Sequence, residues 1–266
     1  MRLVITSDLE FGEDRQSKLT AFSDDISAAQ PEILILAGNL GGSPDEIDAT
    51  LNTLSNIECQ KAAIFGNRDV WNRNGQNSES LWNNVLPDLL ERHGYVYLER
   101  ENLVIDRIGI SGSIVWYDYS GRDPQLKYTV EQYAELKGLV NKDAQYIDWP
   151  WTDQDFASQR QVDFLNRLEL LDRDRQSDHV VVITHFPVFG EALVREPADQ
   201  RWNFGMAYAF NLTVGRGIAP RSKVRHVVSG HIRNGGKWQV NFGPNVIQTH
   251  VVGHGGTAPG ITVINL

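Results

Sequence analysis

Short runs of apolar residues recur along the chain, and each run ends in turn-forming or polar residues. Continuous runs rich in β-branched side chains are typical of strands that are buried on both faces of a sheet. The sequence predicts such strands at Leu3–Thr6, Ile33–Ala37, Ala62–Phe65, Ile108–Ser111, Val180–Thr184 and Val224–Ser229.

Apolar residues at helical spacing separate the early strands. The spacing predicts a helix over Lys18–Ala29 and a second over Pro44–Leu54, where Ser43 is placed to cap the first turn ahead of a proline. An alternation of strand and helix is the signature of right-handed βαβ units. Further helices are predicted at Ser80–Arg92, Val130–Val140 and Asp153–Leu171.

The last part of the chain has a different pattern. Strand-like segments at Lys237–Phe242, Val246–Val252 and Ile261–Ile264 are separated by Gly, Pro and Asn turns, which predicts a closing antiparallel meander. His250 and His254 lie near the end of these strands, and we interpret them as part of a solvated turn rather than as a metal pair.

We expect one domain over residues 1–266, because composition is even and no linker or repeat interrupts the chain. An aromatic-rich excursion around residues 116–152 is the least predictable segment. We interpret it as a surface excursion, with a flap over a functional site as the alternative.

Composition excludes several classes of protein. A net charge of −9 argues against a nucleic-acid partner, since a phosphate backbone selects basic surfaces. No apolar stretch is long enough for a membrane span, and the start of the chain is too short for a signal-peptide core. The single cysteine, Cys59, cannot form an internal disulfide. We therefore expect a cytoplasmic protein with no membrane partner; the oligomeric state stays open.

Polar clusters follow the predicted buried strands, at the positions where open α/β sheets place their ligands. Each cluster alone has an ordinary explanation as a turn, but their succession favours an active-site origin. The clusters are Ser7-Asp8-Leu9-Glu10, Gly38-Asn39, Gly66-Asn67-Arg68-Asp69, Thr184-His185 and Gly230-His231-Ile232-Arg233.

From Asp8 to Arg233, this series resembles the motifs of the calcineurin-like metallophosphoesterases: Asp-x-His, Gly-Asp, Gly-Asn-His-Asp/Glu, a lone His and Gly-His-x-His. The resemblance implies a four-layer αββα sandwich, in which helices flank two mixed β-sheets. It also implies two metal ions bridged by the aspartate of Gly-Asp, which would act on a phosphoryl group between them.

Carried over position by position, the resemblance is uneven. Asp8 matches a ligand of the first metal, but Glu10 stands in place of that metal's histidine and Asn39 in place of the bridging aspartate. The resemblance implies that Asn67, His185 and His231 are ligands of the second metal.

The remaining positions are those expected to act on substrate. Arg68 replaces the histidine that helps to protonate the leaving group, and Asp69 matches the acid beside it. Arg233 replaces the last histidine ligand of the first metal. Arginine offers only donors and cannot ligate a cation. We predict catalytic roles for Arg68, Asp69 and Arg233, and substrate binding by the two arginines.

Charge counting points the same way. Asp8, Glu10 and Asp69 against Arg68 and Arg233 give a nearly neutral cluster without metal, and Arg233 could form a bidentate pair with Asp8 or Glu10. We therefore expect an empty first metal site. The cofactor is then either one divalent ion (Mn, Fe or Zn) on Asn67, His185 and His231, or none.

Three functions stay open at this point. The chain is either a phosphoester hydrolase that uses at most one metal, or an inactive pseudo-phosphoesterase that binds a phosphorylated or anionic ligand, or an interaction module with a vestigial site. The expected partner is a small phosphorylated molecule or phosphate. Neither the substrate nor a preference for monoesters or diesters follows from the residues.

Overall fold

The computed structural model describes residues 1–9, 14–73, 75–253 and 259–266 of the chain. The strands are β1 (Arg2–Thr6), β2 (Ile33–Ala37), β3 (Gln60–Ile64), β4 (Val96–Tyr97), β5 (Leu103–Ile105), β6 (Ile108–Ser113), β7 (His179–Thr184), β8 (Val224–Ser229), β9 (Gly236–Phe242), β10 (Asn245–Val251) and β11 (Ile261–Asn265).

The α-helices are α1 (Arg15–Ala28), α2 (Pro44–Thr53), α3 (Ser78–Ser80), α4 (Leu86–Arg92), α5 (Val130–Leu136), α6 (Asp143–Tyr146), α7 (Asp153–Arg173), α8 (Gln200–Gly205) and α9 (Leu212–Ile218). Single turns of other helix types are η1 (Leu54–Asn56), η2 (Asn67–Val70), η3 (Leu81–Val85), η4 (Pro124–Leu126), η5 (Lys137–Leu139), η6 (Gly190–Ala192) and η7 (Met206–Tyr208).

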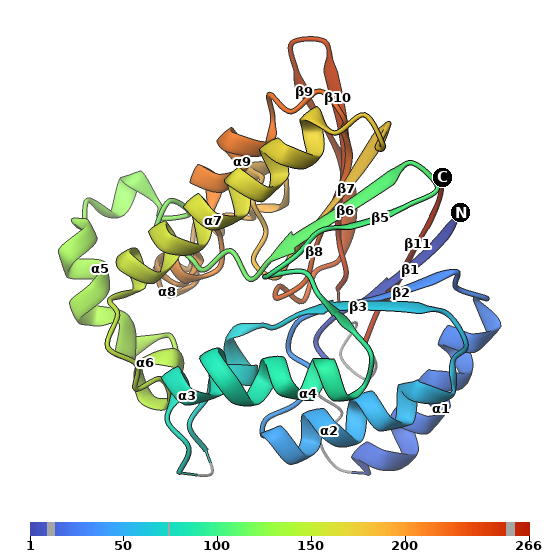
Figure 1. Ribbon diagram of the computed structural model, residues 1–266. Helices are drawn as coiled ribbons and strands as arrows, with labels where there is room; N and C mark the ends of the chain where they lie inside the picture. The colour runs from blue at the N-terminus through green and yellow to red at the C-terminus, as the bar shows by residue number, and fades with distance from the viewer. Residues whose placement is uncertain (10–13, 74, 254–258) are drawn as a thin grey trace.

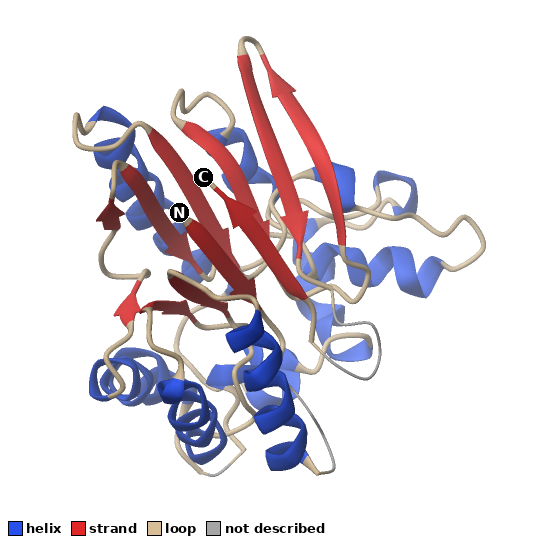
Figure 2. Cartoon of the chain, turned by 90° about the vertical axis from the view of Figure 1, so that its right-hand side faces the viewer, coloured by secondary structure: helices blue, strands red, loops and turns tan. Residues whose placement is uncertain are grey.

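Two mixed sheets pack face to face between layers of helices (Figure 1), so the predicted αββα sandwich is confirmed. One sheet has the order β11-β1-β2-β3-β4 and the other has the order β5-β6-β7-β8-β10-β9. Strands β1 to β4 run parallel, as do β6, β7, β8 and β10. Figure 2 shows the strands of the larger sheet side by side, with helices on both sides of the molecule.

Alternation along the strands divides the core into layers. In β1, Leu3 and Ile5 point between the sheets, where they join Ile110 of β6 and Ile183 of β7, whereas Val4 packs on the helix side. All of these side chains are fully buried. The outer face of the second sheet is covered by α7 and α9 in the same way. Continuous apolar runs are needed because both faces of each inner strand are covered.

Most predicted elements are confirmed within a few residues. The expected cap of α2 is present, since the Ser43 side chain accepts from the Glu46 N–H. The predicted helix Ser80–Arg92 is interrupted by the π-turn η3. Pro87 lacks the N–H that would bond to the carbonyl of Asn83, and that carbonyl accepts from Arg100 instead, at 3.0 Å.

The predicted closing meander is wrong in its last strand. β9 and β10 form an antiparallel hairpin in the second sheet, but β11 pairs antiparallel with β1 in the first sheet. There it covers the free edge of β1 and adds Ile264 to the core between the sheets. His250 is also not in a turn: it is a buried residue of β10. His254 lies outside the described residues.

The segment around residues 116–152 is not a plain surface excursion. Its side chains Trp116, Tyr117, Tyr119 and Tyr133 are almost completely buried and belong to the same cluster as the outer face of the first sheet. Figure 1 shows α5 and α6 of this segment at one side of the molecule, near α8.

No helix within the described residues is long and apolar enough to cross a lipid bilayer.

Candidate functional site

The predicted polar residues gather where five strands end. Asp8 follows β1, Asn39 follows β2, Asn67 follows β3, His185 follows β7 and His231 follows β8. Since the parallel strands of both sheets end on the same side, these residues from distant parts of the chain come into contact. Glu10 lies outside the described residues.

A glycine makes the close approach between the two sheets possible. A Cβ on Gly66 would lie 2.6 Å from His185 Nε2 and would also collide with Asn39 Oδ1. Real Cβ atoms do not come this close to their neighbours, so any side chain at this position would push His185 and Asn39 apart.

The half of the site around Asp8 is closed by hydrogen bonds within the protein. Asp8 Oδ1 accepts from Asn39 Nδ2 at 2.8 Å, and Asp8 Oδ2 accepts from Ser7 Oγ and from the His231 N–H, both at 2.8 Å. The Arg68 N–H donates to Asn39 Oδ1 at 3.0 Å, which fixes the orientation of the Asn39 amide. Asn39 therefore presents a donor to Asp8, in the place where the family's bridging carboxylate would present a ligand.

Both carboxylate oxygens of Asp69, a predicted catalytic residue, accept hydrogen bonds from backbone N–H groups. Its Oδ2 accepts from the N–H groups of Asn39 (2.8 Å) and Gly66 (2.7 Å), and its Oδ1 accepts from those of Leu40 (2.7 Å) and Gly41 (3.2 Å). Burial raises the pKa of Asp69 to about 7, against the lowering effect of these four donors. In these contacts Asp69 ties the loop after β2 to the loop after β3.

The half of the site around Asn67 is arranged differently. His185 is fully buried, and its Nδ1 must donate to the Ala37 carbonyl at 2.9 Å, because a carbonyl only accepts. Burial lowers the pKa of His185, which favours the neutral ring and leaves a lone pair on Nε2. That nitrogen faces Asn67 Oδ1 at 3.2 Å.

The Asn67 amide cannot relieve this contact by turning over. Asn67 Nδ2 donates to Asp143 Oδ1 at 2.8 Å, so Oδ1 is the atom directed at His185. Two lone pairs thus face each other. Two ligands that hold one metal at about 2.0–2.2 Å lie roughly 3.0–3.4 Å apart, and the observed spacing falls in that range. Asn67 and His185 therefore fit a divalent cation.

His231 lies beside this pair. Its ring centroid is 5.1 Å from that of His185 and 4.2 Å from that of Phe186. Within the described parts of the chain, no group of three or more His, Cys, Asp or Glu side chains is arranged to hold a metal. The second-metal half combines histidines with an amide oxygen, and an amide is a weaker ligand than the missing carboxylate.

Arg233 does not take the predicted position. It is exposed, and among the described residues no hydrogen bond or ion pair joins it to Asp8, whose oxygens accept from three other groups. The pairing of Arg233 with Asp8 is thus wrong, and a pairing with Glu10 concerns a residue outside the described ranges.

Arg68 lies partly buried at the site and shares an aromatic ring with a second arginine. Arg68 Cζ is 4.9 Å from the centroid of Trp71, and Arg73 Cζ is 4.6 Å from the same ring. Burial and the neighbouring Arg73 lower the pKa of Arg68, while Asp8, Asp143 and Asp69 oppose that shift. Arg73 was not predicted from the sequence, and it adds positive charge to this side of the site.

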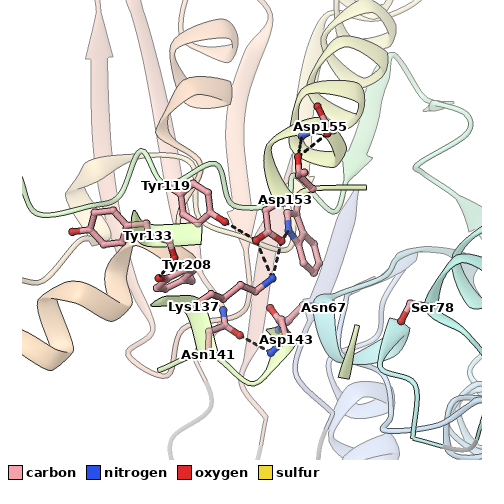
Figure 3. Close-up of polar contacts among 12 residues, drawn as sticks. Asn67, Ser78, Tyr119, Tyr133, Lys137, Asn141, Asp143, Asp153, Asp155 and Tyr208 are labelled. Carbon is pink, nitrogen blue, oxygen red and sulfur yellow. Dashed lines mark hydrogen bonds and ion pairs between the residues drawn. The ribbon is translucent and has the colours of Figure 1, made fainter. Parts of the chain in front are cut away.

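Asp143 is the principal residue that sequence reasoning missed. It begins α6 in the aromatic-rich segment, and its Oδ1 accepts from Asn67 Nδ2 at 2.8 Å (Figure 3). The same oxygen also accepts from Trp71 Nε1 at 2.7 Å. The same figure shows Asp153, which accepts from Trp116, Tyr119 and Lys137 and anchors this segment to α7. An isolated Asp in a charged stretch of sequence carries no signal of such a contact.

The charge count at the site changes in its members. Asp143 adds a buried carboxylate, and Arg73 rather than Arg233 is the second arginine beside Arg68. Among the described residues, Asp8, Asp69 and Asp143 thus stand against Arg68 and Arg73, and burial raises the pKa of Asp69 to about 7. The charge of these residues therefore stays close to neutral, as predicted for a different set.

Comparison with solved structures gives relatives of the same fold at low sequence identity. Phosphopantetheinyl hydrolase (PptH) from Mycobacterium tuberculosis matches at 18% identity with a TM-score of 0.72, covering 95% of this chain and 89% of that one. A dimetal phosphatase from Danio rerio matches at 13% identity with a TM-score of 0.58, covering 100% and 92%. No curated protein matches the chain significantly in sequence.

A family model decides the assignment. The model for calcineurin-like phosphoesterases matches residues 1–233, which include every polar cluster after the strands. Members of this family generally bind divalent metal ions. The chain belongs to the calcineurin-like phosphoesterase family.

Proposed function

We propose that this protein hydrolyses a phosphoester of a small molecule with the help of one divalent metal ion. The observation that carries the proposal is the pair of facing lone pairs on Asn67 Oδ1 and His185 Nε2, 3.2 Å apart. A buried contact of this kind is unfavourable unless a metal ion, or a proton on His185 Nε2, lies between the two atoms, and burial, which lowers the pKa of His185, disfavours the proton. His231, whose ring packs beside His185, would complete the protein ligands.

The half of the site around Asn67 and the half around Asp8 would have different roles. A metal held by Asn67 and His185 would supply Lewis-acid polarisation of the phosphoryl group and a lowered pKa of water. The Asp8 half would hold the loop after β8 in place through the His231 N–H. No second ion is needed in this proposal, because the Asn39 amide already donates to Asp8.

Positive charge for the substrate would come from Arg68 and Arg73. Both guanidinium groups lie over Trp71, which restricts their motion, and Arg68 is close enough to Asp8 and Asp143 to feel their charge. Arginine stabilises the charge that develops on phosphoryl oxygens during transfer. Arg233 would contribute to substrate binding from the exposed rim.

A second candidate is a pseudo-phosphoesterase that binds a phosphorylated or anionic ligand without hydrolysing it. The hydrogen bonds of Asp8 and Asn39 favour this candidate, since every side-chain oxygen and amide nitrogen of these two residues already has a partner within the protein. Arg68 and Arg73 would then be the binding groups.

One experiment separates the two. Protein purified without added metal is analysed by elemental analysis and assayed at high enzyme concentration with Mn²⁺ on 4-nitrophenyl phosphate, bis(4-nitrophenyl) phosphate and a phosphopantetheine diester. The last substrate is chosen from the solved hydrolase of the same fold, a likeness that extends to the fold alone. About one equivalent of metal with turnover supports the hydrolase. No turnover together with a thermal shift on addition of phosphate supports the binder and overturns the hydrolase.

A further inference from the structure

Asp143 is buried and yet has an incomplete set of partners. Its side chain is fully shielded from solvent, and Oδ1 accepts two hydrogen bonds, from Asn67 Nδ2 and Trp71 Nε1. Oδ2 accepts no hydrogen bond of good geometry from the residues that the structure describes, although the Tyr117 hydroxyl is close enough to interact with the Asp143 carboxylate, which contributes to the raised pKa of Tyr117. A buried carboxylate is costly unless its oxygens are well satisfied or a positive charge lies close by.

The first consequence of this contact is the orientation of Asn67. Trp71 Nε1 can only donate, so the Asp143 atom next to it must be an acceptor. The Asn67 atom next to that acceptor must in turn be Nδ2, which directs Oδ1 at His185 Nε2. Without Asp143 the Asn67 amide could flip and donate a hydrogen bond from Nδ2 to His185 Nε2. An ordinary hydrogen bond would then replace the two facing lone pairs.

The second consequence concerns charge. Asn39 is neutral where the family's motif has an aspartate, so the ligand pair has lost a neighbouring negative charge. Asp143 brings a carboxylate close to the same pair, because it accepts a hydrogen bond from Asn67, one of the two ligands. A carboxylate behind a metal ligand strengthens binding and fixes the ligand's orientation.

We propose that Asp143 is a positioning residue: it holds the Asn67 amide with its oxygen toward the metal and supplies the negative charge that Asn39 lacks. This inference rests on the proposed function insofar as a cation binds at Asn67 and His185. A purely structural tether is the competing explanation, because residues 116–152 also contact the rest of the protein elsewhere.

Asp148 offers a matched control for the tether. It lies in the same segment, is exposed, and accepts from the Ser78 N–H at 2.7 Å and from Asn72 Nδ2 at 2.6 Å. Like Asp143, it ties the segment to the region after β3 through an asparagine side chain, but that asparagine is not in the site. Asp148→Asn therefore reports the effect of weakening a tether alone.

The experiment measures Mn²⁺ and Zn²⁺ affinity of the full-length, metal-stripped protein by calorimetry. Asp143→Asn can keep both hydrogen bonds through its Oδ1 but removes the charge, so we expect affinity to fall about 10-fold. Asp143→Ala removes the acceptor as well, and we expect a fall of about 100-fold. Asp148→Asn should stay within about twofold of the unchanged protein. If Asp143→Ala fails to fold, the comparison of the two Asn variants decides.

A second readout needs no metal. The ¹⁵N shift of His185 Nε2 in metal-stripped protein reports whether a lone pair or an N–H donor faces that nitrogen. We expect a shift toward the hydrogen-bonded value in Asp143→Ala and no change in Asp148→Asn. Unchanged Nε2 shifts in both variants would overturn the positioning role.

The two readouts separate the two proposals. If the unchanged protein binds no metal, the hydrolase proposal fails, and the ¹⁵N shifts still decide whether Asp143 orients Asn67. If the unchanged protein binds metal but Asp143→Asn and Asp148→Asn bind it equally well, the role of Asp143 is overturned while the proposed function stands.

Discussion

Two asparagines at the ends of neighbouring strands take opposite orientations. Asn39 directs its Nδ2 at Asp8 and receives the Arg68 N–H on Oδ1, whereas Asn67 gives its Nδ2 to Asp143 and directs Oδ1 at His185. The same type of side chain thus presents a donor in one half of the site and an acceptor in the other. What differs is the partner of each amide: Asn39 is held by the motif residues Asp8 and Arg68, whereas Asn67 is held by Asp143, which lies outside the motifs.

The largest effect is expected from His185→Ala, which removes one of the two facing lone pairs. Metal content should fall from about one equivalent to under a tenth, and phosphoester hydrolysis should fall by about 100-fold or more. Elemental analysis and the rate with Mn²⁺ are the measurements. His93→Ala is the control, since His93 pairs with Asp48 away from the strand ends. If His185→Ala retained its metal, the proposal that the metal binds at the Asn67 half of the site would be contradicted.

Gly66→Ala should disturb both halves at once. The new methyl group would lie 2.6 Å from His185 Nε2 and would collide with Asn39 Oδ1, so we expect a loss of about 2–3 kcal/mol in the free energy of unfolding and weaker metal binding. Denaturant unfolding measures the loss. Gly190→Ala is the matched control, because a Cβ at Gly190 meets no atom within 4 Å. Equal stability of the two variants would contradict the tight approach.

Asn39→Asp should make the two halves more alike. A carboxylate in place of Nδ2 would face Asp8 Oδ1, so the metal-free protein should lose about 1–3 kcal/mol of stability. Excess Mn²⁺ should recover much of this loss, because a cation between two carboxylates relieves the repulsion. Melting temperatures with EDTA and with Mn²⁺ test the prediction; a variant that melts at the same temperature in both conditions would contradict it.

The smallest effect concerns a second close pair of polar atoms, remote from the site. His226 Nδ1 and His250 Nε2 lie 3.3 Å apart, and here one nitrogen can donate to the other. Burial lowers the pKa of both residues, that of His250 to about 4. The folded state therefore binds fewer protons than the unfolded state between about pH 6.5 and pH 4, and stability should fall as pH decreases through this window.

The His226–His250 prediction is checked by the melting temperature at pH 7 and pH 5. We expect a lower value at pH 5, and a smaller difference in His250→Gln, which has no proton to gain. An equal difference in the two proteins would show that the acid sensitivity arises elsewhere.

Much of the fold follows from the sequence because its cause is local. The β-branched runs such as Ile33–Ala37 are strands, Ser43 caps α2, and the polar residues after each strand meet because parallel strands end at one edge. The choice of sheet for β11 is not local: it depends on the free edge of β1, which no pattern around Ile261–Asn265 encodes.

The site was predicted by position but not by orientation. Asp8, Asn39, Asn67 and His185 meet as expected, yet the direction of each amide depends on partners up to 76 residues away along the chain, as for Asn67 and Asp143. Arg233 follows the motif in sequence but does not contact Asp8, whose oxygens already accept from Ser7, Asn39 and the His231 N–H.

Residues 116–152 contact Asn67 through the carboxylate of Asp143. Binding of a cation at Asn67 should therefore change how often this segment detaches from the rest of the protein. A cation that fixes Asn67 also favours the arrangement in which α6 is docked, so the loaded protein should open this segment less often. Lys127 and Lys142 are exposed there. Limited digestion with trypsin should then cleave the metal-free protein sooner than the metal-bound protein. Resistance to cleavage would therefore report the fraction of the protein that has metal bound.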